Sequence, residues 1–182
     1  MNVLNRHARC LVWLSLALML GACAQLAPLP TQMPRLDLPL QLHIERRSQD
    51  DVRTYDVRTW LLVIQQEGAA LRWSLLDPLG VPLARQLLVN GQWRADGLLP
   101  PNAEARELFA ALLFALTPAD QLDDLYSDTS WSQQQDGRSL ASDTSSAWHV
   151  RYRENDRFDL DVGSALTYGV APIATATGAR QK

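Results

Sequence analysis

The chain has 182 residues, a formal net charge of −3, 47% hydrophobic residues, two cysteines and three histidines. This length fits one domain, and the acidic balance gives no electrostatic hold on nucleic acid, which excludes that class of partner. We find no Cys/His spacing typical of a metal site, no glycine-rich phosphate loop and no nucleophile-elbow pattern. Neither a metal nor a cofactor is therefore expected.

The N-terminal residues follow the layout of a bacterial export signal. Basic residues at Arg6 and Arg9 precede an apolar run from Leu11 to Leu20 that is too short to remain as a membrane-spanning helix. The run ends in Leu20-Gly21-Ala22-Cys23, the pattern cut by the lipoprotein signal peptidase, which requires an acylated cysteine. We predict that residues 1–22 are a signal peptide and that Cys23 is the lipidated mature N-terminus. The alternative is an ordinary export signal or anchor with a chance cysteine.

Processing at this site would leave the folded domain without a thiol or a disulfide. Cys10 would be discarded with the signal and Cys23 would carry lipid, which excludes redox and thiolate chemistry. Ala24 and Gln25 follow the cysteine, where an aspartate would be the usual signal for retention in the inner membrane. We therefore expect attachment to the outer membrane, facing the periplasm.

Residues 23–35 are expected to form a tether. They include Pro28, Pro30 and Pro34 and few charges, a composition that favours extended, polyproline-like conformations. At about 3.1 Å per residue the tether would hold the domain roughly 35 Å from the bilayer, or let it lean back onto the surface.

A single domain is predicted over residues 36–172, and it begins as an antiparallel sheet. Apolar and polar residues alternate from Leu38 to Ile44, and the charged segment 46–53 is expected to be a loop or hairpin tip. Asp77-Pro78-Leu79-Gly80 matches a type I turn with Leu79 at its tip. Further strands are expected at 55–64, 70–75, 81–89 and around Trp93.

Helical spacing then replaces the strand pattern. Asn102 can cap a helix whose apolar stripe includes Leu108 and Leu116, and Thr117-Pro118 begins a second helix that ends near Tyr126. The polar stretch after the Asp136-Gly137 turn, through Ser146, is expected to be a loop. Strands at 148–153 and 157–162 and a last strand at 166–170 are expected to close the sheet, before a disordered tail at 173–182.

The predicted fold class is mainly β with helices, an α+β fold in which a curled antiparallel sheet forms an incomplete barrel under a helical lid. Five tryptophans belong to the mature domain, and they either fill the core or line an apolar cavity that the helices only partly fill. The candidate cavity residues are Trp60, Leu62, Trp73, Leu75, Leu108, Phe109, Leu112 and Leu113.

Acid/base chemistry finds little support in the sequence. The acidic pairs Asp50-Asp51, Asp123-Asp124 and Asp159/Asp161 fall in a loop, on a helix surface and on a polar strand face, where solvated charge is the better interpretation. His43 and His149 also fall on polar strand faces. No catalytic residue is assigned, and we do not expect an enzyme.

The order of these features resembles the outer-membrane lipoprotein receptor LolB and its periplasmic carrier relative LolA. The closest local match is Leu75-Leu76-Asp77-Pro78-Leu79-Gly80, because LolB has a similar leucine-rich strand that enters an Asn-Pro-Leu-Gly turn. In that family the turn leucine projects from the barrel and delivers lipoproteins to the membrane. The resemblance implies this role for Pro78, Leu79 and Gly80, with Asp77 in place of asparagine.

The whole chain is still more similar to an uncharacterised family of proteobacterial lipoproteins, LolB-like in fold, whose genes accompany aryl-polyene biosynthesis. The residues that carry this resemblance include Leu98-Leu99-Pro100-Pro101 and Leu166-Thr167-Tyr168-Gly169. It implies a role in moving or anchoring an acyl or polyene lipid and supplies no catalytic residues.

Together these features predict a membrane-anchored lipoprotein that binds acyl chains and passes them to the outer membrane, with a soluble LolA-like carrier as a possible donor. Apolar burial supplies the affinity without any catalytic group. Two alternatives remain open: a scaffold with a filled core that recruits other envelope proteins, and a lipid-modifying enzyme.

Overall fold

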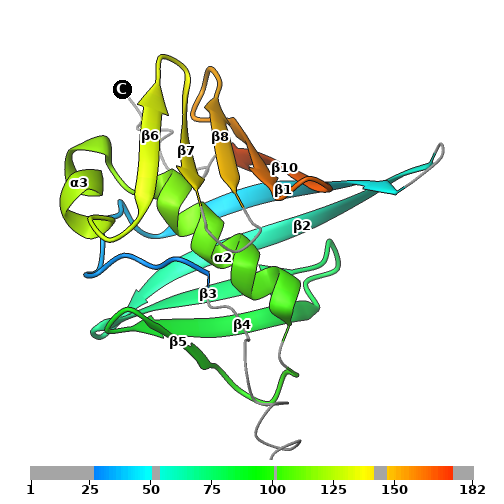
Figure 1. The fold of residues 1–182 in the computed structure, drawn as a ribbon. Helices are drawn as coiled ribbons and strands as arrows, with labels where there is room; N and C mark the ends of the chain where they lie inside the picture. The colour runs from blue at the N-terminus through cyan, green and yellow to red at the C-terminus, as the bar shows by residue number, and fades with distance from the viewer. Residues whose placement is uncertain (1–26, 51–53, 101, 142–146, 174–182) are drawn as a thin grey trace, which may run out of the picture.

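Figure 1 shows the computed structural model, which describes residues 27–50, 54–100, 102–141 and 147–173. The predicted signal peptide, Cys23 and most of the predicted tail lie outside these residues. The described part is a ten-stranded antiparallel sheet in the order β5-β4-β3-β2-β1-β10-β9-β8-β7-β6, with few helices. An α+β fold built on an antiparallel sheet is thereby confirmed.

The first five strands are β1 (Leu40–Asp50), β2 (Thr54–Glu67), β3 (Ala70–Leu76), β4 (Pro82–Val89) and β5 (Gln92–Ala95). Helix α2 (Ala103–Leu116), the short 3-10 helix η1 (Ala119–Gln121) and helix α3 (Leu122–Leu125) follow. The second five strands are β6 (Ser130–Gln134), β7 (Gly137–Ala141), β8 (Trp148–Tyr152), β9 (Phe158–Val162) and β10 (Leu166–Pro172).

The last strand does not close the sheet, contrary to our expectation. β10 lies at the centre, where it pairs with β1 from Leu42↔Pro172 to Ser48↔Leu166 and with β9 on its other side. Among the described strands, β5 and β6 each pair on one side only, so the sheet stays open. β1 pairs with β2 along one edge and with β10 along the other. Because β10 also pairs with β9, it joins the two halves of the sheet.

Two segments that were expected to be loops belong to strands. β1 continues through the charged residues 46–50, where Arg46 pairs with Tyr168 of β10 and with Arg58 of β2. β7 occupies the start of the polar stretch that follows the Asp136-Gly137 turn. Neighbouring strands pair with the backbone in both places, β2 and β10 with β1, and β6 and β8 with β7, and residue composition does not reveal such long-range pairing.

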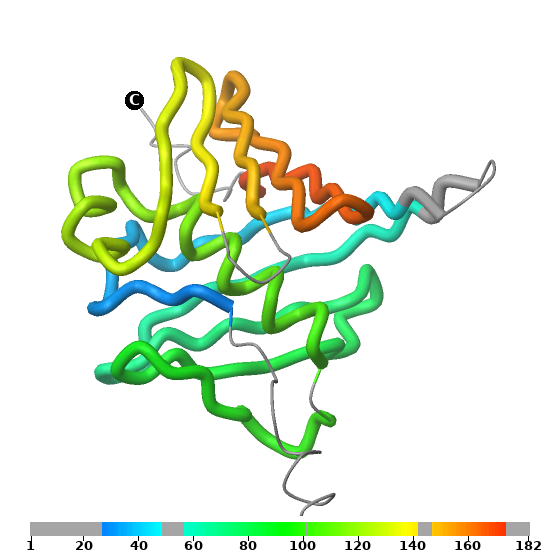
Figure 2. The backbone as a smooth tube through the Cα atoms, viewed as in Figure 1, coloured from blue at the N-terminus to red at the C-terminus, as the bar shows by residue number. Residues whose placement is uncertain are grey.

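Helix α2 lies on the concave side of the curled sheet and fills its interior (Figures 1 and 2). Ala105 and every residue from Leu108 to Ala115 are buried, so the helix is apolar on nearly all sides. Alternate residues of the strands face it, among them Leu42, Ile44 and Trp73, as the period-two pattern predicts. A helix of this kind is stable only when the sheet wraps around it.

The N-terminal segment is docked on the domain from Ala27 onward. Pro30 and Pro34 are buried, and Leu29 and Met33 pack against the core. Most of the segment that was expected to be a tether therefore lies against the folded domain.

Two hydrogen bonds join this segment to the helical region. The Thr31 N–H donates to the Leu125 carbonyl at 2.9 Å, and the Arg35 N–H donates to Gln121 Oε1 at 2.9 Å. The carbonyl oxygen of Pro30, the residue before Thr31, lies beside Gly91 in the turn between β4 and β5. The segment thus bridges from that turn to η1 and α3.

The C-terminal end of α2 is held by an arginine from β7. Arg138 donates from Nη2 to the Ala115 carbonyl and from Nη1 to the Thr117 carbonyl, both at 2.8 Å. Its guanidinium also donates to the Tyr152 hydroxyl and stacks on the Phe114 ring, 5.4 Å from the centroid. α2 has no basic residue in its last turn, so Arg138 supplies the cation that the helix terminus favours.

Replacement of Arg138 by alanine should lower the free energy of unfolding by about 2 kcal/mol, because two carbonyls at the helix end lose a charged donor. Urea unfolding followed by tryptophan fluorescence measures this change. The matched control is Arg153→Ala, which removes an exposed ion pair to Asp159 and should cost less than about 1 kcal/mol. Equal losses in the two variants would contradict the helix-capping role.

Candidate functional site

An open groove of about 520 Å³ lies at the N-terminal end of α2. Its apolar lining comes from β2, β3, the β3–β4 turn, β4 and the first turn of α2. These residues are Trp60, Leu75, Pro78, Leu83 and Ala105. Its polar lining is formed by Arg58, Thr59, Asp77, Asn102 and Glu104. Apolar surface with a few polar groups at the edge is the usual character of a small-molecule site.

The β3–β4 turn forms one side of the groove and is fixed by Asp77. The Asp77 carboxylate oxygen Oδ1 accepts hydrogen bonds from the Leu79 N–H at 2.9 Å and the Val81 N–H at 2.8 Å. The Gly80 N–H donates to the Asp77 carbonyl at 3.0 Å, the bond expected of a type I turn. Leu79 is 89% exposed at the tip, as the turn chemistry predicts.

A β-bulge directs Leu83 into the same groove. Leu75 pairs with Ala84 whereas Leu76 pairs with Pro82, so Leu83 is an extra residue in β4. Strict alternation would turn Leu83 away from the side on which Leu75 and Ala84 lie. The bulge breaks that alternation, and both Leu75 and Leu83 line the groove.

A hydrogen-bonded carboxylate fixes the other side of the groove. Glu104, in the first turn of α2, accepts from Arg46 Nε at 2.6 Å and from the Tyr168 hydroxyl at 3.0 Å, both through Oε1. Asn102 caps the helix through its side-chain oxygen, which accepts from the Ala105 N–H at 3.0 Å. These bonds tie the start of α2 to β1 and β10.

Burial raises the pKa of the Tyr168 phenol well above its ordinary value, and the neighbouring Glu104 carboxylate adds to the effect. The phenol therefore remains a hydrogen-bond donor to Glu104 at all physiological pH values. The ring of Tyr168 also lies against Trp60, with centroids 6.3 Å apart.

The predicted cavity residues divide into two groups. Trp60 is half-buried and lines the groove, and Leu75 is buried and also lines it. The other six are buried between the sheet and α2: Leu62, Trp73, Leu108, Phe109, Leu112 and Leu113. The rings of Trp73 and Phe109 lie 5.4 Å apart, and Trp73 meets Trp93 edge to face at 5.6 Å. Aromatic side chains thus pack directly against the helix in this region.

Several groove residues were not identified from the sequence, among them Arg58, Leu83 and Glu104. Arg58 belongs to a charged stretch that resembles any solvated strand, and Leu83 enters only because of the bulge. Asn102 was identified as a helix cap but not as part of a site. A glutamate two residues after a cap is a common helix feature, so its contact with Arg46 and Tyr168 had no local signal.

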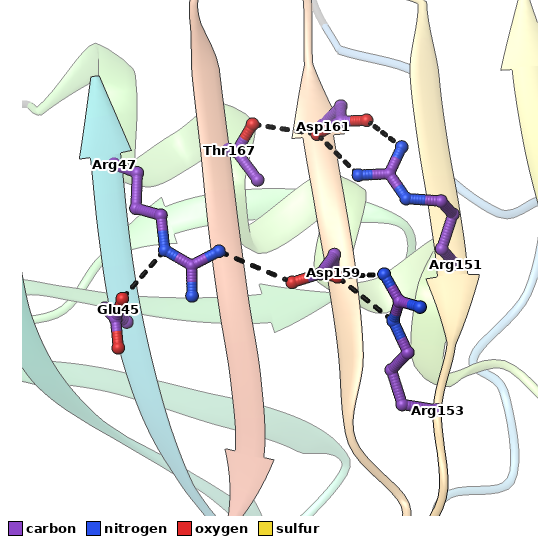
Figure 3. Close-up of polar contacts among 7 residues, drawn as sticks. All are labelled: Glu45, Arg47, Arg151, Arg153, Asp159, Asp161 and Thr167. Carbon is purple, nitrogen blue, oxygen red and sulfur yellow. Dashed lines mark hydrogen bonds and ion pairs between the residues drawn. The ribbon is translucent and has the colours of Figure 1, made fainter. Parts of the chain in front are cut away.

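The face of the sheet opposite α2 is polar across β1, β10, β9 and β8. Figure 3 shows a lattice of charges across β1, β10, β9 and β8, with Asp159 bound by Arg153 at 2.9 Å and Asp161 bound by Arg151 at 2.6 Å. Two hollows on this face, of about 440 and 400 Å³, are lined mainly by charged and polar residues. Fewer of their lining residues are apolar than in the groove at α2.

Comparison with known proteins identifies a family. Residues 39–167 match the model of the family described as "protein of unknown function (DUF3261)", and the chain belongs to this family. No curated protein matches the chain.

Within the described ranges no helix is both long and apolar enough to cross a membrane. In the same residues no group of His, Cys, Asp and Glu side chains is arranged to hold a metal ion.

Asp77→Ala should lower the free energy of unfolding by about 1 kcal/mol and loosen the β3–β4 turn, because two N–H groups lose their acceptor. Asp77→Asn keeps an acceptor oxygen and should stay close to the parent protein. Hydrogen exchange of the Leu79 and Val81 amides reports on the turn directly. Unchanged exchange of both amides in Asp77→Ala would show that the carboxylate does not hold the turn.

The raised pKa of Tyr168 should make folding less stable as the pH rises through about 10. In the unfolded chain the phenol ionises near that pH, whereas in the folded protein it keeps its proton. The folded state then binds more protons and loses stability. In Tyr168→Phe the decline of the urea midpoint with pH should be shallower, and an identical decline in both proteins would contradict the assignment.

Proposed function

We propose that this protein is an outer-membrane-anchored periplasmic lipoprotein that binds acyl or other lipid chains and assists their transfer to, or localisation in, the outer membrane. The groove at the N-terminal end of α2 is the binding site in this proposal. The observation that carries it is an apolar groove bordered by a rigid turn that presents an almost fully exposed leucine, Leu79.

Apolar burial supplies the binding energy in this scheme. Transfer of apolar surface out of water is favourable by roughly 25 cal/mol per Å², or about 0.8 kcal/mol per methylene. Trp60, Leu75 and Leu83 offer such surface, while Arg58 and Thr59 lie where a polar headgroup would meet water. A chain bound this way needs no catalytic group and leaves again when a more apolar environment is offered.

The proposal assigns the membrane attachment to acylated Cys23 and the transfer step to the turn Pro78-Leu79-Gly80. The resemblance to LolB and to the aryl-polyene-associated family adds three elements to this proposal. They are a LolB-like fold, a soluble LolA-like carrier as the donor and an aryl-polyene-type lipid as the cargo. The open sheet with a helix in its concave face is compatible with such a fold.

A scaffold is the second candidate function, and the packing around α2 favours it. Six of the eight predicted cavity residues are buried between the sheet and the helix, so the interior offers no lipid-sized space beside Trp73 and Phe109. Native mass spectrometry of the gently purified full chain separates the two functions. A co-purifying lipid mass supports the carrier, and a lipid-free protein that also fails to take up added lipid supports the scaffold.

Leu79→Glu should leave folding intact and abolish lipid transfer to acceptor vesicles, because a charge at the turn tip opposes contact with the acyl region. The matched control is Val57→Glu, at a residue of β2 that is 53% exposed and does not line the groove. Transfer of a fluorescent fatty acid or of a lipoprotein measures the effect. Normal transfer by Leu79→Glu would remove the turn from the proposed mechanism.

A further inference from the structure

The docked N-terminal segment determines how far the domain can lie from its anchor. Only Ala24, Gln25 and Leu26 separate Cys23 from Ala27, at which the docked segment begins. Four extended residues span at most about 14 Å. An anchor at Cys23 therefore cannot hold Ala27 far from the bilayer, in contrast to the roughly 35 Å of the undocked tether.

The docking itself rests on several independent contacts. Pro30 and Pro34 are buried, Leu29 and Met33 pack on the core, and the Thr31 N–H bonds to the α3 carbonyl of Leu125. In Figure 1 the segment, in blue, runs on the same side of the sheet as α2, which is also the side of the groove. A short connection to the membrane thus begins on the groove side of the domain.

Exposed apolar side chains occur in the two connections that lead into groove-lining residues, the β3–β4 turn and the β5–α2 connection. Leu79 and Val81 belong to the β3–β4 turn region, and Leu98 precedes the cap residue Asn102 of α2. Leu98 is fully exposed and Val81 is 54% exposed. The turn and the β5–α2 connection lie at the same end of the molecule as the start of α2 (Figure 1).

We propose that the domain is held in contact with the membrane that carries its own anchor, and that Leu98, Val81 and Leu79 form the lipid-contacting rim of the groove. This inference rests on the proposed lipidation of Cys23 and adds a fixed orientation and a second contact loop. The groove then opens toward the anchoring membrane, so that a bound chain passes into that membrane without crossing bulk water.

The test uses the full, lipidated protein in vesicles of phosphatidylethanolamine and phosphatidylglycerol. Because Cys23 is acylated and Cys10 is removed, Leu98→Cys provides a single thiol for an environment-sensitive fluorophore. Gln135→Cys, in the exposed β6–β7 turn at the other end of the molecule, is the matched control. Doxyl-labelled lipid should quench the label at position 98 by about twofold or more and leave the label at position 135 unchanged.

A longer spacer tests the role of the short connection. Insertion of about 12 Gly and Ser residues between Gln25 and Leu26 restores a long reach and should reduce the quenching at position 98. Equal quenching with both spacers, or quenching of the two labels to the same extent, would overturn the inference. Circular dichroism of each labelled protein verifies the fold.

The anchor itself is tested separately by partition of the parent protein into a detergent phase and by the mass of its N-terminal peptide. An unacylated protein contradicts the proposed function. An acylated protein whose label at position 98 remains unquenched contradicts only the membrane contact proposed here.

Discussion

The structure depends on one packing constraint: helix α2 is apolar on almost every side and must be enclosed. A curled sheet of ten strands wraps around it, and among the described strands the sheet stays open at β5 and β6. Two arginines from distant strands hold the two ends of the helix, Arg46 through Glu104 at the start and Arg138 through backbone carbonyls at the end. The position of α2 in turn decides where empty space is left.

That space lies at the start of the helix. Along the middle of α2, large side chains such as Trp73 and Phe109 close the distance between helix and sheet. At the N-terminal end, Ala105 presents little bulk, and the groove there is lined also by Leu83 at the bulge and by Asp77 of the β3–β4 turn. The result is a groove with an apolar floor at the border of the domain, next to the most exposed apolar residues of the β3–β4 turn.

The two faces of the sheet have opposite chemistry. The concave face supplies the core and the groove, while on the opposite face β1, β9 and β8 carry charges that pair across strands, as in Asp159 between Arg47 and Arg153. Gly169 of β10 lies beside the Arg47 guanidinium, and a Cβ there would come within 3.1 Å of Arg47 Nη2, which would have to shift by a few tenths of an ångström. In the proposed function, the lipid chain binds on the concave side.

The sequence by itself determined the features that depend on neighbours along the chain: strand alternation, the cap at Asn102, the turn that exposes Leu79 and the α+β class. It also named Trp60 and Leu75 as candidate lining residues, as large apolar side chains on strands that face the helices, although six other residues of that set are buried in the core. Only the tertiary structure decided that β10 lies at the centre, that residues 46–50 and 137–141 are strands, and that residues 27–35 dock on the domain. It also decided that Arg58, Leu83 and Glu104 meet in one groove. The physical reason is that pairing, docking and cavity shape arise from contacts between segments far apart in the chain, which leave no local periodicity.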